Sequence, residues 1–237
     1  MKILAIDTSG LPASVSVVEE NRVIGEFHVQ NFQKHARTLM PMIDQLLTML
    51  DMDISQIDLI GCASGPGSFT GLRIGAATAK ALAYAADIPI APVPTLDALA
   101  YNIFNTDSLI APIMDARRSQ VYAAFYQWRT GDLDGFGLTR LTEYWAADIA
   151  EIIQRAAAYK RSVIFLGDGV PVYQDVIRKA DNCRFAFAPA HLNWQRAASV
   201  GSLGLRLAKE GRTVRSEHFT LFYLRQSQAE RERAAHG

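Results

Sequence analysis

Short apolar runs and amphipathic segments alternate along the first half of this 237-residue chain. Apolar runs bounded by turn residues predict strands, and apolar residues at helical spacing predict helices. The predicted strands cover residues 2–7, 13–19, 22–30, 57–63 and 88–93, and the predicted helices cover residues 37–50, 75–86 and 95–104. Three strands followed by strand–helix alternation predict a mixed sheet with helices on its faces.

The same kind of pattern begins again in the second half of the chain. Its predicted strands cover residues 109–115, 121–128, 162–166 and 183–187, and its predicted helices cover residues 146–159, 172–180 and 195–210. We therefore expect an α/β protein of two subdomains, residues 1–105 and 106–225, with a charged tail at 226–237. The helix at 195–210 is a candidate to pack back on the first subdomain.

The amino-acid composition limits the classes of function that the chain can have. The 24 basic and 24 acidic residues leave no net charge, so we expect any RNA to be held mainly by another subunit. Cys62 and Cys183 both lie in apolar runs, which predicts buried thiols rather than a disulfide or a metal pair. No apolar run approaches the ~18 residues of a membrane span, and we expect a cytoplasmic protein.

A glycine-rich segment, Ser-Gly-Pro-Gly-Ser-Phe-Thr-Gly-Leu-Arg-Ile-Gly at residues 64–75, separates a predicted strand from a predicted helix. Gly65 and Gly67 allow the backbone to approach a ligand closely, and a helix start offers free N–H groups to an anion. The segment lacks the Gly-Lys-Ser/Thr of a P-loop, and Thr70 stands where a dinucleotide fingerprint has its third glycine. A phosphate-type turn and a turn that merely packs tightly both remain open.

Two Asp-containing turns end predicted strands, one in each half of the chain. Asp7 is followed by Thr8 and Ser9, and Asp168 stands between Gly167 and Gly169. Each turn alone fits an ordinary Asx-type turn. As a pair they resemble the phosphate turns of the actin-like ATPase and sugar-kinase superfamily, in which a nucleotide lies between two related domains. The candidate vestigial nucleotide-binding residues are Asp7, Thr8, Ser9, Gly65, Gly67, Gly167, Asp168 and Gly169.

The helix at residues 37–50 carries an apolar arc of about a half-circle, wider than the ~100° that a core-facing helix needs. Its members are Leu39, Met40, Met42, Ile43, Leu46, Leu47, Met49 and Leu50. We expect Leu39, Ile43, Leu46 and Leu50 to face the sheet. Methionines on the flanks of the arc would suit an irregular protein surface, although a helix buried wholly within its own domain fits equally well.

The chain resembles the TsaB (YeaZ) family, a component of the machinery that makes N6-threonylcarbamoyladenosine at position 37 of tRNAs reading ANN codons. The glycine-rich segment with its Phe-Thr-Gly-Leu-Arg is the most specific match. The other matching segments are residues 1–9, 35–43, 94–100, 113–118 and 223–225, together with Ala229 and Glu230.

The resemblance implies an actin-like (ASKHA) fold and a protein that is not the catalyst. The paralogue TsaD carries the metal and transfers the threonylcarbamoyl group. TsaD-like proteins have a His-x-x-x-His metal pair where this chain has Thr95 and Leu99, neither of which replaces an imidazole ligand. We therefore expect no catalytic residue, no metal and no intrinsic cofactor, with any ATP or ADP held at an interface of the complex.

The resemblance also implies partners: the TsaD paralogue, the ATPase TsaE, a second copy of the chain in isolation, and tRNA only through the complex. The expected partner interface comprises His35, Leu39, Met42, Ile43, Leu46, Met49, Arg73, Ala76 and Lys80. The alternative function is an ATP-dependent phosphotransferase of the same superfamily that uses Asp7 and Asp168.

Overall fold

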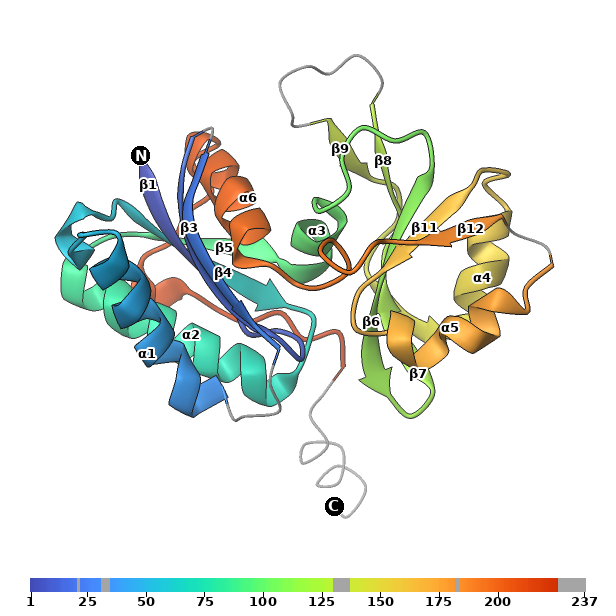
Figure 1. The fold of residues 1–237 in the computed structure, drawn as a ribbon, viewed down its shortest axis with the longest axis horizontal. Coiled ribbons are helices and arrows are strands. Elements are labelled where there is room, and N and C mark those ends of the chain that lie inside the picture. The colour runs from blue at the N-terminus through green and yellow to red at the C-terminus, as the bar shows by residue number, and fades with distance from the viewer. Residues whose placement is uncertain (21, 31–34, 130–136, 182–183, 226–237) are drawn as a thin grey trace.

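The computed structural model describes residues 1–237 except 21, 31–34, 130–136, 182–183 and 226–237. It forms two α/β lobes side by side (Figure 1). The sheet of the first lobe contains β1 (Lys2–Asp7), β2 (Ala13–Glu19), β3 (Arg22–Val29), β4 (Leu59–Gly65) and β5 (Ile90–Pro94). Its order is β3-β2-β1-β4-β5, with β1, β2 and β3 antiparallel and β4 and β5 parallel to β1.

Helices cover both faces of the first sheet. The helices α1 (His35–Met49) and α2 (Phe69–Ala86) lie on one face, and α6 (Ala197–Lys209) returns from the end of the chain to cover the other (Figure 1). The short helix α3 (Thr95–Ala100) leads to the second lobe, and two 3-10 turns, η1 (Ile54–Gln56) and η2 (Ser216–His218), complete the helical segments of this part.

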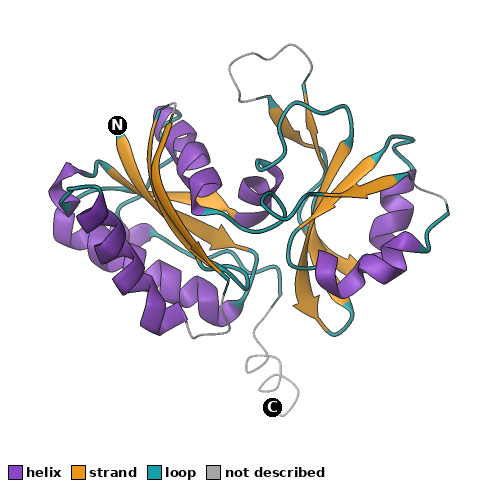
Figure 2. Ribbon diagram, in the orientation of Figure 1, coloured by secondary structure: helices purple, strands orange, loops and turns teal. Residues whose placement is uncertain are grey.

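The second sheet repeats the strand order of the first. Its strands are β6 (Leu109–Arg117), β7 (Gln120–Ala123), β10 (Trp145–Asp148), β11 (Val163–Leu166) and β12 (Phe185–Phe187), in the order β10-β7-β6-β11-β12. Again the first three strands of this order are antiparallel neighbours and the last two are parallel. The strands β8 (Tyr126–Trp128) and β9 (Leu138–Arg140) extend from β6, and α4 (Ile149–Ala157) and α5 (Val170–Arg178) cover the sheet (Figure 2).

This duplicated topology confirms the actin-like fold class. Several element boundaries differ from the prediction. The helix α2 begins at Phe69 rather than at residue 75, because the Ser68 side chain accepts a hydrogen bond from the Gly71 N–H (3.3 Å) and caps the helix. The predicted strand at 121–128 is divided into β7 and β8. The predicted helix at 146–159 begins as β10, because pairing with β7 overrides the helix propensity of its alanines.

The lobes are joined at the carboxylate of Asp97 on α3. Its Oδ1 accepts hydrogen bonds from the hydroxyls of Tyr126 and Tyr144, each at 2.7 Å, and Arg140 lies 3.9 Å away. Burial is the main cause that raises the pKa of both phenols, and the charge of Asp97 adds to it. Both phenols therefore remain protonated donors, and α3 is tied to the second lobe by charge-assisted bonds.

Cys62 is a buried free thiol, as predicted, whereas Cys183 lies outside the described residues. Within the described ranges, no helix has both the length and the apolar character needed to cross a bilayer.

Gly71 provides a test of the packing between α2 and the first strand. A Cβ at this position would lie 2.0 Å from the carbonyl oxygen of Thr8, so the helix would have to move. We expect Gly71→Ala to lower the free energy of unfolding by about 3 kcal/mol, measured by urea denaturation.

Gly211→Ala is the matched control. Gly211 has φ +70°, but a Cβ there would meet no neighbouring atom within 4 Å, so only backbone strain of about 1 kcal/mol is expected. Equal losses in the two variants would contradict the packing explanation.

Candidate interlobe site and partner surface

The first Asp turn lies at the end of β1, where the lobes meet. Asp7 is 1 % exposed, and its Oδ1 accepts hydrogen bonds from the N–H (2.9 Å) and the hydroxyl (2.6 Å) of Ser9. Its Oδ2 has no hydrogen-bond partner among the described residues. Burial raises the pKa of Asp7 to about 6, although the hydrogen bonds from Ser9 oppose the shift.

The second Asp turn lies at the end of β11. The Asp168 carboxylate accepts a hydrogen bond from the Asp115 N–H at 3.1 Å. Burial raises the pKa of Asp168 to about 6, and the negative charges of Asp115 and Asp7 contribute to the rise. The fold thus brings together two carboxylates, Asp7 and Asp168, that are far apart in sequence and belong to different lobes.

The glycine-rich segment packs directly on the first Asp turn. The Ser68 N–H donates to the Ser9 carbonyl oxygen at 2.7 Å, and the Thr8 hydroxyl donates to the Gly71 carbonyl oxygen at 2.8 Å. A Cβ at Gly67 would lie 2.5 Å from the Ser9 carbonyl oxygen. The glycine-rich segment is therefore tightly packed against the first Asp turn.

Gly65 and the glycines of the second Asp turn also lie close to backbone carbonyl oxygens of the chain. Gly65 has φ +116°, and a Cβ there would lie 2.2 Å from the carbonyl oxygen of Phe222. A Cβ at Gly167 or Gly169 would approach the Ile113 carbonyl oxygen to 2.2 or 3.0 Å. These glycines allow close backbone contacts within the chain, because a side chain would not fit at these positions.

Gln195 is a site residue that sequence reasoning missed. Its side chain lies against Gly10, where a Cβ would come within 2.6 Å of its Cδ. The residue is 1 % exposed, and its amide lies close enough to the Asp168 carboxylate to oppose the rise of that pKa, although the geometry falls short of a hydrogen bond. Gln195 therefore fills the space beside the first Asp turn. This contact joins the segment before α6 to the end of β1, and no local sequence pattern predicts a contact between segments so far apart in the chain.

Thr95 and Leu99, the two positions expected to match the metal pair of TsaD-like proteins, belong to the core. Thr95 and Leu99 are at most 1 % exposed, and the Thr95 hydroxyl accepts a hydrogen bond from the Gly65 N–H at 3.2 Å. Over the described ranges, no three His, Cys, Asp or Glu residues are grouped so that they could hold a metal ion.

The structure divides the expected partner interface into buried and exposed residues. Five of its nine residues are at most 8 % exposed and pack in the core of the first lobe: Leu39, Met42, Ile43, Leu46 and Ala76. In the isolated chain the arc that carries them faces the sheet, and only its edge reaches the surface.

The remaining residues lie at or near the surface of α1 and α2. Met49 is 69 % exposed, Arg73 is exposed, and His35 and Lys80 are half-buried. Two further exposed residues, Met40 (47 %) and Tyr84 (80 %), were not assigned to the interface. We call the surface formed by Met40, Met49, Lys80 and Tyr84 the α1–α2 face.

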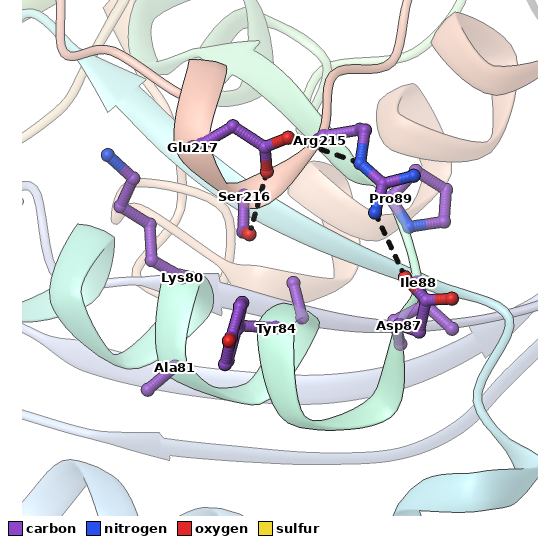
Figure 3. Close-up of a pocket in the computed structure, with 10 residues that line it drawn as sticks. Lys80, Ala81, Tyr84, Asp87, Ile88, Pro89, Arg215, Ser216 and Glu217 are labelled. Atoms are coloured by element: carbon purple, nitrogen blue, oxygen red, sulfur yellow. Dashed lines mark hydrogen bonds and ion pairs between the residues drawn. The ribbon is translucent and has the colours of Figure 1, made fainter.

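A groove of about 640 Å³ lies at one end of the α1–α2 face. Figure 3 shows Lys80 and Tyr84 on α2 at one side of it and Arg215 and Glu217 on the C-terminal segment at the other. Arg215 is paired with Asp87 (3.1 Å) and Glu217 (3.2 Å). The groove therefore places side chains of both charges beside the exposed methionines and the tyrosine of the α1–α2 face.

Comparison with known proteins identifies the family. The family model described as TsaD: tRNA N6-adenosine threonylcarbamoyltransferase matches residues 29–232. The Bacillus subtilis tRNA threonylcarbamoyladenosine biosynthesis protein TsaB is 34 % identical, over 97 % of this chain and 96 % of its own length. The chain belongs to the TsaB family.

Other members agree with this assignment. Escherichia coli TsaB is 28 % identical over 97 % of this chain and 96 % of its own length. The crystal structure of YeaZ from Pseudomonas aeruginosa has a TM-score of 0.75 and 25 % identity, covering 94 % of this chain and 99 % of that one. TsaB-family membership thus agrees with the fold.

The buried Asp7 carboxyl predicts a pH-dependent stability. Its pKa in the folded chain, about 6, lies above the usual 3.8, so the folded chain binds more protons between these values. The free energy of unfolding should therefore fall as the pH rises from about 4 to 7, by up to about 3 kcal/mol for this group.

Asp7→Asn keeps the Oδ1 acceptor for Ser9 and removes the charge. We expect the variant to be more stable than the wild type at pH 7 by about 1–3 kcal/mol, and to lose stability less steeply between pH 5 and 7. Urea unfolding at the two pH values measures both effects. An unchanged slope would show that Asp7 is not the titrating group.

Proposed function

We propose that this chain is a non-catalytic subunit of tRNA threonylcarbamoyladenosine biosynthesis that binds its paralogue TsaD and holds it in an active conformation. The observation that carries the proposal is that residues of both Asp turns and of the glycine-rich segment pack against the chain's own atoms. The glycine turns pack on backbone carbonyls, Gln195 covers the first Asp turn, and Thr95 and Leu99 stand in the core where TsaD-like proteins have metal ligands. Chemistry at this site would require these contacts to open.

The α1–α2 face supports the binding part of the proposal. Large exposed apolar side chains such as Met49 and Tyr84 are typical of protein interfaces, and methionine adapts to irregular partners. The exposed side of α2 also carries Ala77 and Ala81, whose small side chains let a partner helix approach closely.

A paralogue of the same fold would present equivalent helices to this face. The same reasoning allows two copies of the chain to pair through it, because a self-complementary patch can also accept a similar fold. In the proposed assembly TsaE joins the TsaD-bound chain, ATP or ADP lies at an interface of the complex, and tRNA is bound by the complex. We expect it to act in the cytoplasm.

Reconstitution tests the function. Purified TsaD from the same source, TsaE, ATP, tRNA transcript and threonylcarbamoyl-adenylate are combined with and without this chain, and modified adenosine is measured by mass spectrometry of nucleosides. We expect modification at least ~10-fold faster with the chain, which corresponds to a barrier change of about 1.4 kcal/mol. Equal rates with and without it would overturn the proposal.

Charge placed on the α1–α2 face tests the interface. We expect Met49→Asp with Tyr84→Asp to abolish co-purification with TsaD, because two carboxylates would be desolvated in an apolar contact. Met42→Asp is unsuitable, since Met42 is 8 % exposed and the charge would unfold the first lobe.

Val172→Asp is the matched control. Val172 is 57 % exposed on α5 of the second lobe, so the same kind of substitution is made away from the α1–α2 face. Thermal melting should show that all variants are folded. Retained binding of TsaD by the double variant would show that the interface lies elsewhere.

An ATP-dependent phosphotransferase is the second candidate, because the fold brings Asp7 and Asp168 together between the lobes. Calorimetry of the isolated chain with ATP and Mg²⁺ separates the two functions. Micromolar binding with turnover would favour the phosphotransferase.

A further inference from the structure

The tip of the hairpin between β6 and β7 has an unusual backbone. Arg117, Arg118 and Ser119 all have positive φ, at 63°, 55° and 59°. Residues with side chains rarely adopt this left-handed conformation, and three in succession are rarer still. The hairpin nevertheless carries two arginines here, and the Arg117 side chain is 87 % exposed. Both arginines are exposed at the tip of the hairpin between β6 and β7.

A third guanidinium is brought to this tip by the C-terminal segment. Arg225 Nη1 donates to the carbonyl oxygen of Ala116 at 3.5 Å, although the two residues belong to distant parts of the chain. Two residues earlier, the Tyr223 hydroxyl lies 3.5 Å from Arg73 Nε, at the start of α2. The segment thus contacts Arg73 of the first lobe and the tip of the β6–β7 hairpin of the second.

Little negative charge balances these four arginines. Arg117 is paired with Asp115 at 3.2 Å, and the described residues provide no other salt bridge to the set. The net charge of zero therefore conceals a local excess of positive charge.

Exposed aromatic rings lie among the arginines. Phe222 is 42 % exposed and Tyr223 is 37 % exposed, and the Tyr223 ring lies 4.9 Å from that of Phe69. Guanidinium groups bind phosphate oxygens through paired N–H donors, and exposed rings stack on unpaired bases. Paired bases in an RNA helix are already stacked and cannot reach such rings, so this combination suits a loop rather than a duplex.

We propose that Arg73, Arg117, Arg118, Phe222, Tyr223 and Arg225 form a basic–aromatic surface that binds the phosphates and an unpaired base of an RNA loop. The inference rests on the proposed function, in which the complex acts on tRNA, and adds that this chain itself contacts the RNA. An acidic protein segment would use the arginines but would gain little from the exposed rings.

The experiment measures RNA binding by the complex of this chain with TsaD, using a fluorescent anticodon stem-loop transcript and a fully paired RNA of equal length. We expect Arg117→Glu with Arg118→Glu to weaken stem-loop binding by about 10-fold or more. The slope of log K against log salt should become shallower by about 1.4, as two phosphate contacts are lost. Tyr223→Ala should weaken binding of the stem-loop by about 5- to 100-fold and leave binding of the paired RNA unchanged.

Arg22→Glu with Arg212→Glu is the matched control, because it reverses two exposed arginines, 71 % and 64 % exposed, away from the basic–aromatic surface. It should bind RNA as the wild type does. Wild-type RNA binding by the Arg117/Arg118 variant in an intact complex would overturn the inference. So would loss of TsaD binding by that variant, which would assign the surface to a protein contact. Failure of the wild-type chain to bind TsaD would instead contradict the proposed function.

Discussion

The contact between the start of α2 and the end of β1 is the constraint on which the rest of the structure depends. The N–H of Ser68 bonds to the Ser9 carbonyl oxygen, and Gly67 and Gly71 allow the two backbones to approach within a distance that no side chain would permit. This contact sets where α2 begins and holds it beside α1. The same contact packs the glycine-rich segment directly against the first Asp turn.

The two lobes are related by their repeated strand order, and the Asp turns of β1 and β11 lie where the lobes meet. Asp7 and Asp168 approach each other as they would in a two-lobed nucleotide-binding protein, yet burial keeps their pKa values near 6 and Gln195 occupies the adjoining space. Asp97, with its two tyrosine donors, ties α3 to the second lobe. A fold whose helices expose large apolar side chains such as Met49 and Tyr84 is suited to binding a partner.

Sequence patterns predicted the positions of helices and strands well, but they predicted less well which side chains lie at the surface. The strands β1 and β2 and the helix α1 were predicted closely, because continuous apolar runs and helical periodicity report local structure directly. The strand β10 was predicted as helix, because Trp145–Asp148 becomes a strand only through pairing with β7. Met42 was assigned to the interface because periodicity places it on the arc, whereas its burial depends on how deeply α1 sits on the sheet.

The sequence by itself determined the two-lobed α/β class, the family resemblance, and the lack of histidines at Thr95 and Leu99, since these follow from residue identity and spacing. Only the tertiary structure decided that the glycine turn packs on Ser9, that Gln195 lies beside Gly10, and that Arg225 joins Arg117 at one surface. Each of these contacts joins segments far apart in the chain. Local patterns carry no information about such pairs, because chain folding and backbone approach set their distances.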